Sequence, residues 1–237
     1  MKKILRWLVY GLLAAAMKLT MKVHVVGKEN LPASGPYIVI GNHFSWFEAP
    51  LLIHTLPQHP ILFGAVEIVR IPAIRFLAWL FPVIPVWRGQ VDRQALHSAL
   101  DALQAGQVLG IFPEGGIDPE LQTALSQGHQ FARTEGQNTR RPAVLIKAHS
   151  GPAYLAVASG VPILPIAYMG TENVLDNLRH FRRTPVTVRI GPLFGPLALP
   201  AGARGAARRQ AYAALADGMM REVAALMPAA YHGVYAA

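Results

Sequence analysis

Short runs of β-branched and aliphatic residues alternate with helix-forming segments along most of the chain, and this alternation constrains the fold more than any other feature. Strands and helices that alternate in this way build domains in which helices cover a central sheet. We therefore predict an α/β sandwich. The expected strands are residues 23–26, 37–40, 61–65, 83–86, 108–112, 163–167 and 186–190, and the expected helices are residues 49–55, 73–80, 94–103, 152–159 and 208–227.

The length of 237 residues suits one α/β domain. We take residues 23–237 as that domain and residues 1–22 as a separate N-terminal helical segment. Residues 118–142 break the alternation, because they are polar and show no sustained hydrophobic period. Loops of this length are usually functional lids or disordered segments, and we predict a long excursion there.

The N-terminal segment is apolar from Ile4 to Leu19 apart from Arg6 and Lys18. As a helix it would span roughly 24 Å at about 1.5 Å per residue, which is short of the roughly 30 Å hydrocarbon core of a bilayer. Basic residues flank it on both sides, as in helices that lie among lipid headgroups. We predict a monotopic membrane anchor. A secretory signal peptide and an ordinary helix packed on the domain are the alternatives.

Charge and composition restrict the partners. Twenty-two Lys and Arg against thirteen Asp and Glu give a net charge of +9, which attracts polyanions of any kind. No nucleic-acid-binding motif accompanies the charge, so we expect anionic lipid and no nucleic acid. The absence of cysteine excludes disulfides, thiolate metal sites and cysteine nucleophiles. No paired metal-ligand spacing such as His-Glu-x-x-His occurs, and we expect no metal.

The first motif with chemical potential follows the expected strand 37–40 and contains His43 and Glu48. On a continuous helix, residues five positions apart point to different faces. If the strand ends at His43 and a turn intervenes, the Glu48 carboxylate can bond one imidazole nitrogen and leave the other facing a cleft. Such a pair works as a general base, with a substrate hydroxyl in the place of a serine. A histidine that only caps the strand end is the alternative.

Two further motifs lie at the ends of expected strands. Glu114 and Gly115 follow a buried strand, where glycine lets a ligand approach the backbone. Arg88 follows another strand, and its planar guanidinium suits phosphate. The alternatives are a plain strand-to-loop turn for the former motif and a solvated surface charge for the latter.

Along the chain these motifs come in the order His43–Glu48, Arg88 and Glu114–Gly115, and they are followed by Gly160-Val161-Pro162-Ile163-Leu164-Pro165-Ile166-Ala167. Together they resemble the four sequence blocks of the glycerolipid acyltransferases, best known as 1-acylglycerol-3-phosphate acyltransferases. The resemblance runs from about Val25 to Gly195. It implies a mixed sheet flanked by helices and transfer of a fatty acyl group to a lysophosphatidic acid-like acceptor in phospholipid biosynthesis. The donor would be acyl-CoA or acyl-carrier protein, with no cofactor, at the cytoplasmic face of a membrane.

The resemblance also assigns roles to residues. It makes His43 and Glu48 the catalytic dyad and Arg88, Glu114 and Gly115 the binding site for the acceptor's glycerol and phosphate. Val161 and Pro162 would lie by the acyl-chain site.

The chain departs from the family pattern in its acid and in its third block. Glu48 stands where the family normally has aspartate, and Gly116-Ile117 stands where Thr-Arg is usual. A basic phosphate contact is therefore missing, and the candidate replacements are Arg140, Arg141 and Lys147. An acyltransferase for another lipid acceptor, such as an amino-acid lipid or a glycolipid, is the main alternative. A non-catalytic membrane module that binds lipid is the other.

Overall fold

The computed structural model describes residues 2–88, 91–120 and 139–236. Its strands are β1 (Met21–Val26), β2 (Tyr37–Gly41), β3 (Ile61–Ala65), β4 (Val83–Val86), β5 (Val108–Ile111), β6 (Ile163–Met169) and β7 (Thr184–Ile190). Its helices are α1 (Lys2–Thr20), α2 (Glu48–Thr55), α3 (Val66–Val69), α4 (Pro72–Leu80), α5 (Arg93–Gln104), α7 (Gly151–Ser159), α8 (Val174–Arg179) and α9 (Gly205–Ala224), and its 3-10 turns are η1 (Lys28–Asn30), η2 (Thr171–Asn173), η3 (Ala229–Tyr231) and η4 (Gly233–Tyr235).

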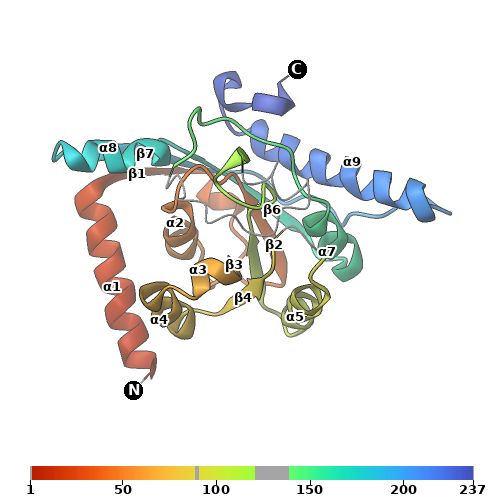
Figure 1. Ribbon diagram of the computed structural model, residues 1–237, viewed down its shortest axis with the longest axis horizontal. Helices are drawn as coiled ribbons and strands as arrows, with labels where there is room; N and C mark the ends of the chain where they lie inside the picture. Colours follow the sequence, from red (N-terminus) through yellow and green to blue (C-terminus); the bar gives the residue numbers. More distant parts are fainter. Residues whose placement is uncertain (1, 89–90, 121–138, 237) are drawn as a thin grey trace.

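The strands form one mixed sheet in the order β1-β7-β6-β2-β5-β3-β4, with helices on both faces (Figure 1). Neighbouring strands are parallel except β6 and β7, which are antiparallel. Every residue of the central strand β2 is buried, as expected of a parallel strand covered on both faces. The predicted mixed α/β fold is confirmed, and each predicted strand is present.

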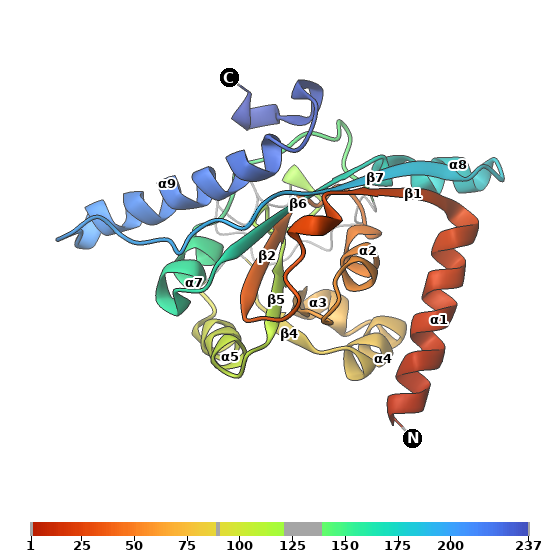
Figure 2. The ribbon, with the colours of Figure 1, turned by 180° about the vertical axis from the view of Figure 1, so that it is seen from behind.

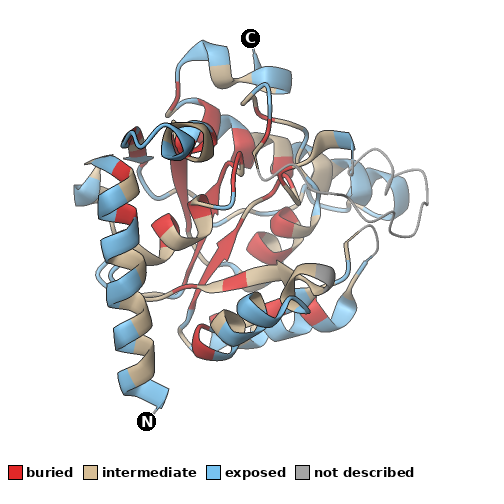
Figure 3. Cartoon of the chain, turned by 60° about the vertical axis from the view of Figure 1, so that its left-hand side comes forward, coloured by how far each residue is buried: buried red, intermediate tan, exposed pale blue. Residues whose placement is uncertain are grey.

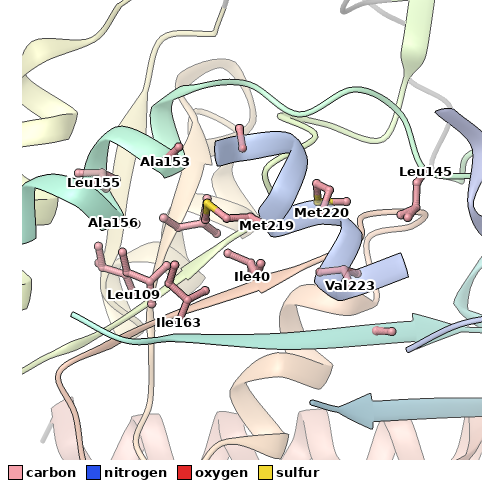
Figure 4. Close-up of a cluster of buried hydrophobic side chains, with 14 of the residues drawn as sticks. Ile40, Leu109, Leu145, Ala153, Leu155, Ala156, Ile163, Met219, Met220 and Val223 are labelled. Atoms are coloured by element: carbon pink, nitrogen blue, oxygen red, sulfur yellow. The ribbon is translucent and has the colours of Figure 1, made fainter. Parts of the chain in front are cut away.

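The sheet separates two hydrophobic clusters. On one face α5, α7 and α9 pack against the strands, and Met219, Met220 and Val223 of α9 reach toward Ile40 of β2 (Figure 4). On the other face α2 packs with the end of α1, where Met17 is buried. Figure 2 shows these two groups of helices on opposite sides of the sheet.

The parallel pairing of β2 and β5 brings their carboxyl ends together. Ile40 lies opposite Ile111 in this register, so the segments that begin after the two strands share one edge of the sheet. The motifs that contain His43 and Glu114 therefore become neighbours. The carboxyl edge of an open α/β sheet is where such folds bind ligands.

Helix α1 covers the predicted N-terminal helix, and part of its surface is exposed (Figure 3). Large apolar side chains lie on this exposed part. The exposed large side chains are Ile4, Trp7, Leu8, Leu12 and Leu19, each at least 66% exposed. The helix also packs on the domain, since Met17 is buried and the Tyr10 ring stacks on His54 with centroids 4.0 Å apart. In the described part of the chain, no helix has the length and hydropathy needed to cross a bilayer.

Other differences from the prediction are small. Helix α9 runs from Gly205 to Ala224, three residues earlier at each end than predicted. The short helices α3 and α8 and the 3-10 turns were not predicted, because segments of three to six residues carry too little periodicity. Most of the predicted excursion at 118–142 lies outside the described residues.

Candidate active site

The chain leaves β2 through Gly41 and Asn42, which end the strand and allow the turn that follows. A side chain at Gly41 would stand 3.0 Å from the Tyr168 ring, so glycine permits the close approach of β6. The Asn42 amide donates to the Tyr168 carbonyl at 2.9 Å and accepts from the Tyr168 N–H at 2.8 Å. Because this side chain replaces the backbone pairing, the main chain is free to turn at His43.

His43 and Glu48 meet across that turn. Nδ1 of His43 lies 3.2 Å from Oε2 of Glu48, whose carboxylate is fully buried, and the His43 side chain is 19% exposed. The imidazole stacks on the Phe112 ring with centroids 4.2 Å apart and planes 15° apart. Nε2 has no hydrogen-bond partner among the residues that the structure describes. The predicted geometry of the pair is thus present.

Neutral donors hold the Glu48 carboxylate. It accepts the Ser45 N–H at 2.9 Å, the Ser45 hydroxyl at 3.1 Å and the Thr171 hydroxyl. The Ser45 hydroxyl in turn accepts the Phe47 N–H at 3.2 Å. These bonds connect the turn before α2 to Glu48, the first residue of that helix. Glu48 also raises the pKa of the Tyr168 phenol, although burial of that phenol is the larger cause.

Glu114 lies beside His43 and bonds its backbone N–H, whereas Glu48 bonds its ring. Oε2 of Glu114 accepts the His43 N–H at 2.6 Å, and Oε1 accepts the Ile146 N–H at 2.9 Å and a guanidinium N–H of Arg140. Burial raises the pKa of the Glu114 carboxyl, and the Arg140 charge offsets part of that effect. Gly115 follows at φ 72° and closes a turn by donating to the Phe112 carbonyl at 3.0 Å. The Glu114 side chain is fully buried, and its contact with an acceptor stays a prediction.

Arg88 approaches the third motif from the end of β4. A Cβ atom added to Gly116 would stand 3.0 Å from Nη1 of Arg88, so the guanidinium lies against the Gly116 backbone. Arg88 is half-buried. The structure thus brings a cation from the second motif to the third, where the usual Thr-Arg is missing.

The remaining predicted basic residues have different surroundings. Lys147 is exposed, and Arg141 is 55% exposed and pairs with Asp176. Arg140 is 1% exposed and donates to protein acceptors, and a phosphate contact for it stays a prediction.

Val161 and Pro162 lie at the opposite edge of the sheet. The Pro162 carbonyl accepts the Ile38 N–H at 3.0 Å, near the start of β2, whereas His43 follows the end of that strand. Five residues of extended chain at about 3.3 Å each separate Ile38 from His43 by roughly 17 Å. The structure does not bring Val161 and Pro162 to the His43 pair, and their place beside an acyl chain stays a prediction.

Within the described ranges, no group of three or more His, Asp or Glu side chains has the arrangement of a metal site. The expectation of a reaction without metal stays a prediction.

Residues 22–169 match the family model described as Acyltransferase. The chain belongs to the Acyltransferase family. It is 26% identical over 182 residues to a 1-acyl-sn-glycerol-3-phosphate acyltransferase of Borreliella burgdorferi, with 76% of this chain and 64% of that protein covered. It is 27% identical over 174 residues to the 1-acyl-sn-glycerol-3-phosphate acyltransferase alpha of Ovis aries, with 73% and 54% covered. The chain thus spans less than two thirds of the length of these curated relatives.

The fold of this Acyltransferase-family chain is also that of a solved structure. The 1-acyl-sn-glycerophosphate (LPA) acyltransferase PlsC from Thermotoga maritima superposes with a TM-score of 0.61 at 21% identity, covering 96% of this chain and 83% of that one. The predicted resemblance to glycerolipid acyltransferases is confirmed at the level of family and fold.

Three residues of this candidate site were missed in the sequence: Asn42, Ser45 and Thr171. The pattern Ser45-x-x-Glu48 ahead of an apolar run is a capping-box signature that could have revealed Ser45. Asn42 and Thr171 act across the fold, and no local pattern marks them. Arg140 was predicted as a phosphate contact and not as a partner of Glu114.

Proposed function

We propose that this protein transfers a fatty acyl group from an acyl thioester of CoA or acyl-carrier protein to the hydroxyl of a lysophosphatidic acid-like acceptor. The observation that carries the proposal is the His43–Glu48 pair at the carboxyl edge of the sheet. A carboxylate only accepts hydrogen bonds, so Nδ1 of His43 carries the proton that lies between the two residues. In the neutral imidazole Nε2 is then the acceptor, and it is the nitrogen available to a substrate.

The reaction that this tautomer supports is direct transfer. Nε2 of His43 takes the proton of the acceptor hydroxyl while the hydroxyl oxygen attacks the thioester carbonyl carbon. The carbon–sulfur bond breaks, an ester forms, and the departing thiolate recovers the proton from the imidazolium. Glu48 stabilises the imidazolium while it exists. A general base of this kind contributes about 10²- to 10⁴-fold, and substrate positioning supplies further acceleration.

The proposed acceptor rests on two kinds of support. The curated relatives are named as acyltransferases for 1-acyl-sn-glycerol-3-phosphate, an acceptor that carries a phosphate. In this chain Arg88 lies against Gly116, in the third motif, and Lys147 is exposed further along the chain. Since Gly116-Ile117 departs from the family pattern, an amino-acid lipid or a glycolipid is the second candidate acceptor.

We also propose that the protein works on a membrane surface, at the cytoplasmic face where both donors occur. Support comes from the exposed apolar face of α1. Beside it, Lys2, Arg6 and Trp79 line an open cavity of about 350 Å³. Lys2 Nζ lies 4.8 Å from the centre of a Trp79 ring, and no described acidic residue pairs with Lys2 or Arg6. Cations beside apolar side chains suit the headgroup region of an anionic bilayer.

The test is acyl transfer by purified protein with an acyl thioester and either lysophosphatidic acid or an acceptor that lacks phosphate. We expect transfer to the phosphate-bearing acceptor, and a rate loss of about 10²-fold or more in His43→Gln. Glu48→Gln should be similarly impaired, because the amide group would no longer stabilise the imidazolium. Transfer only to the acceptor without phosphate would favour the second candidate. A fully active His43→Gln would disprove the mechanism.

A further inference from the structure

Arg140 is the largest fully buried side chain in the described part of the protein. Burying a guanidinium is costly unless its charge and its N–H groups are matched by acceptors. Here Nε donates to the Ile117 carbonyl at 2.8 Å, Nη2 to the Gly116 carbonyl at 2.6 Å, and Nη1 to the Val144 carbonyl at 3.1 Å and to Glu114. Four of its five donors are therefore used inside the protein, and its surroundings are built for it.

These contacts reach His43 from two sides. Through its side chain, Arg140 holds Oε1 of Glu114, whose Oε2 accepts the His43 N–H at 2.6 Å. Through its backbone, the Arg140 N–H donates to the carbonyl of Phe44, the next residue after His43, at 2.6 Å. The guanidinium also lies 5.5 Å from the centre of the Phe44 ring. Arg140 thus holds the main chain after His43 directly, and it holds the N–H of His43 through Glu114.

Arg140 affects Glu114 through its positive charge as well as through its shape. Burial raises the pKa of the Glu114 carboxyl, and the positive charge of Arg140 lowers it. If that charge is removed, Glu114 binds a proton at a higher pH. A protonated oxygen is a donor and a weaker acceptor, so the bond from either the His43 N–H or the Ile146 N–H is then weakened. The His43 backbone would no longer be held as it is in the wild type.

We propose that Arg140 is a positioning residue for His43 that acts through Glu114, and that it does not bind the phosphate of a substrate. The role it would serve in acyl transfer rests on the proposed function, whereas the positioning itself can be measured without activity. A base must keep its geometry toward the substrate hydroxyl for its effect on the rate. Arg140 would supply that geometry from a segment far along the chain.

Kinetics distinguish positioning from phosphate binding. We expect Arg140→Gln to lower kcat by about 10-fold or more while the KM for the acceptor stays within about twofold, because the loss concerns the transition state. Arg140→Lys, which keeps the charge, should recover part of the loss. Arg209→Gln is the matched control, because Arg209 is an exposed residue of α9 to which no role in the site is assigned, and it should retain wild-type kcat. A raised KM for the acceptor with unchanged kcat in Arg140→Gln would overturn the proposal.

A double-mutant cycle tests the route through Glu114. If Arg140 acts through Glu114, Arg140→Gln should cost much less kcat in a Glu114→Gln background than in the wild type. A purely structural role for Arg140 predicts a lower Tm with an unchanged kcat per folded molecule. Additive losses of kcat in the cycle would also contradict the proposal.

A measurement that does not depend on activity is the NMR resonance of the His43 backbone amide in protein labelled with ¹⁵N-histidine. This resonance is identified because it is missing from the spectrum of His43→Gln. We expect this resonance to shift in Arg140→Gln, and its titration with Glu114 to move to higher pH than in the wild type. It should stay in place in Arg209→Gln. If Arg140→Gln does not fold, Arg140→Lys is measured in the same way. An unmoved His43 amide overturns the proposal, whereas a wild type without acyl transfer overturns only the proposed function.

Discussion

Two buried glutamates hold the same histidine, and their surroundings differ in charge. Glu48 bonds the His43 ring and otherwise meets the neutral donors of Ser45 and Thr171. Glu114 bonds the His43 backbone and meets the Arg140 cation. A cation beside Glu48 would compete with the imidazolium for that carboxylate. In the proposed mechanism, these neutral donors fix Glu48 in place and leave its charge to stabilise the protonated His43.

This division predicts the effect of Thr171→Val. The substitution keeps the shape of the side chain but removes the hydroxyl that donates to Glu48. Hydrogen bonds to charged groups contribute about 1.5–3 kcal/mol, so we expect kcat to fall by about 10-fold or more with little change in either KM. Thr20→Val is the control, because its hydroxyl donates to a carbonyl of α1 far from the site. Equal kcat values in both variants would show that Thr171 does not orient the dyad.

Local sequence predicted the contact between His43 and Glu48 but not the residues that hold these two side chains. His43 and Glu48 are five positions apart, and the turn between them follows from the strand that ends there. Thr171 and Asn42 meet their partners across the sheet, at sequence separations of 123 and 126 residues. Such contacts depend on strand order, which no local period encodes. The same holds for Arg140, whose basic character suggested phosphate whereas its burial gives it another partner.

At the scale of elements, α1 shows what periodicity can and cannot predict. The apolar run correctly predicted a helix from its first residues to Leu19. The run is apolar on all sides, however, so the sequence does not indicate which face meets the domain. The structure packs the side of Tyr10 and Met17 and exposes that of Ile4, Leu8 and Leu12. The cations at its first turns thereby come to lie beside Trp79 of α4.

The proposed membrane contact predicts different effects for two charge-matched double variants. Lys2→Gln with Arg6→Gln removes the cations of the cavity, and Lys18→Gln with Lys22→Gln removes two exposed cations from the other end of the segment. Each basic residue near an anionic surface contributes about 1 kcal/mol, so the first pair should weaken binding to anionic vesicles by roughly 30-fold, and the second pair by less.

Co-sedimentation with anionic and neutral vesicles measures both variants against the wild type. High salt should weaken binding of the wild type only in part, because burial of the apolar face of α1 is not screened. Equal losses of vesicle binding in the two double variants would mean that binding depends on charge alone and that the cavity makes no specific contribution. Full binding by both variants would place the membrane contact elsewhere.

At the scale of the whole molecule, the last residues of the chain return to the segment that carries the site. The Tyr231 carbonyl accepts the Leu145 N–H at 2.8 Å, and the Leu145 carbonyl accepts the Val234 N–H at 3.2 Å. The Tyr231 ring stacks on that of Phe44 with centroids 5.9 Å apart. The segment next to Arg140 is therefore fixed by the C-terminal turns. Sequence periodicity gives no sign of this closure, since the turns are too short to predict.

The Tyr235 hydroxyl connects the C-terminal turn η4 with Ala148 and with α9, and Tyr235→Phe should weaken this connection. Its hydroxyl accepts the Ala148 N–H at 2.9 Å and donates to Asp217 of α9 at 3.1 Å. Loss of these bonds should lower the free energy of unfolding by about 1–3 kcal/mol near neutral pH. Tyr154→Phe is the control, because the Tyr154 hydroxyl makes no hydrogen bond to the described residues.

The effect of Tyr235→Phe should also depend on pH, with a sign fixed by the raised pKa. Burial is the main cause that raises the pKa of Tyr235 from 10.0 to about 12. A phenol with a raised pKa contributes its full stability below pH 10.0, and this contribution is lost as the pH rises toward about 12. The free energy of unfolding of the wild type should therefore fall toward that of Tyr235→Phe over this range. Urea denaturation at about pH 8 and about pH 11 measures the difference, and a gap that widens with pH would contradict the assignment.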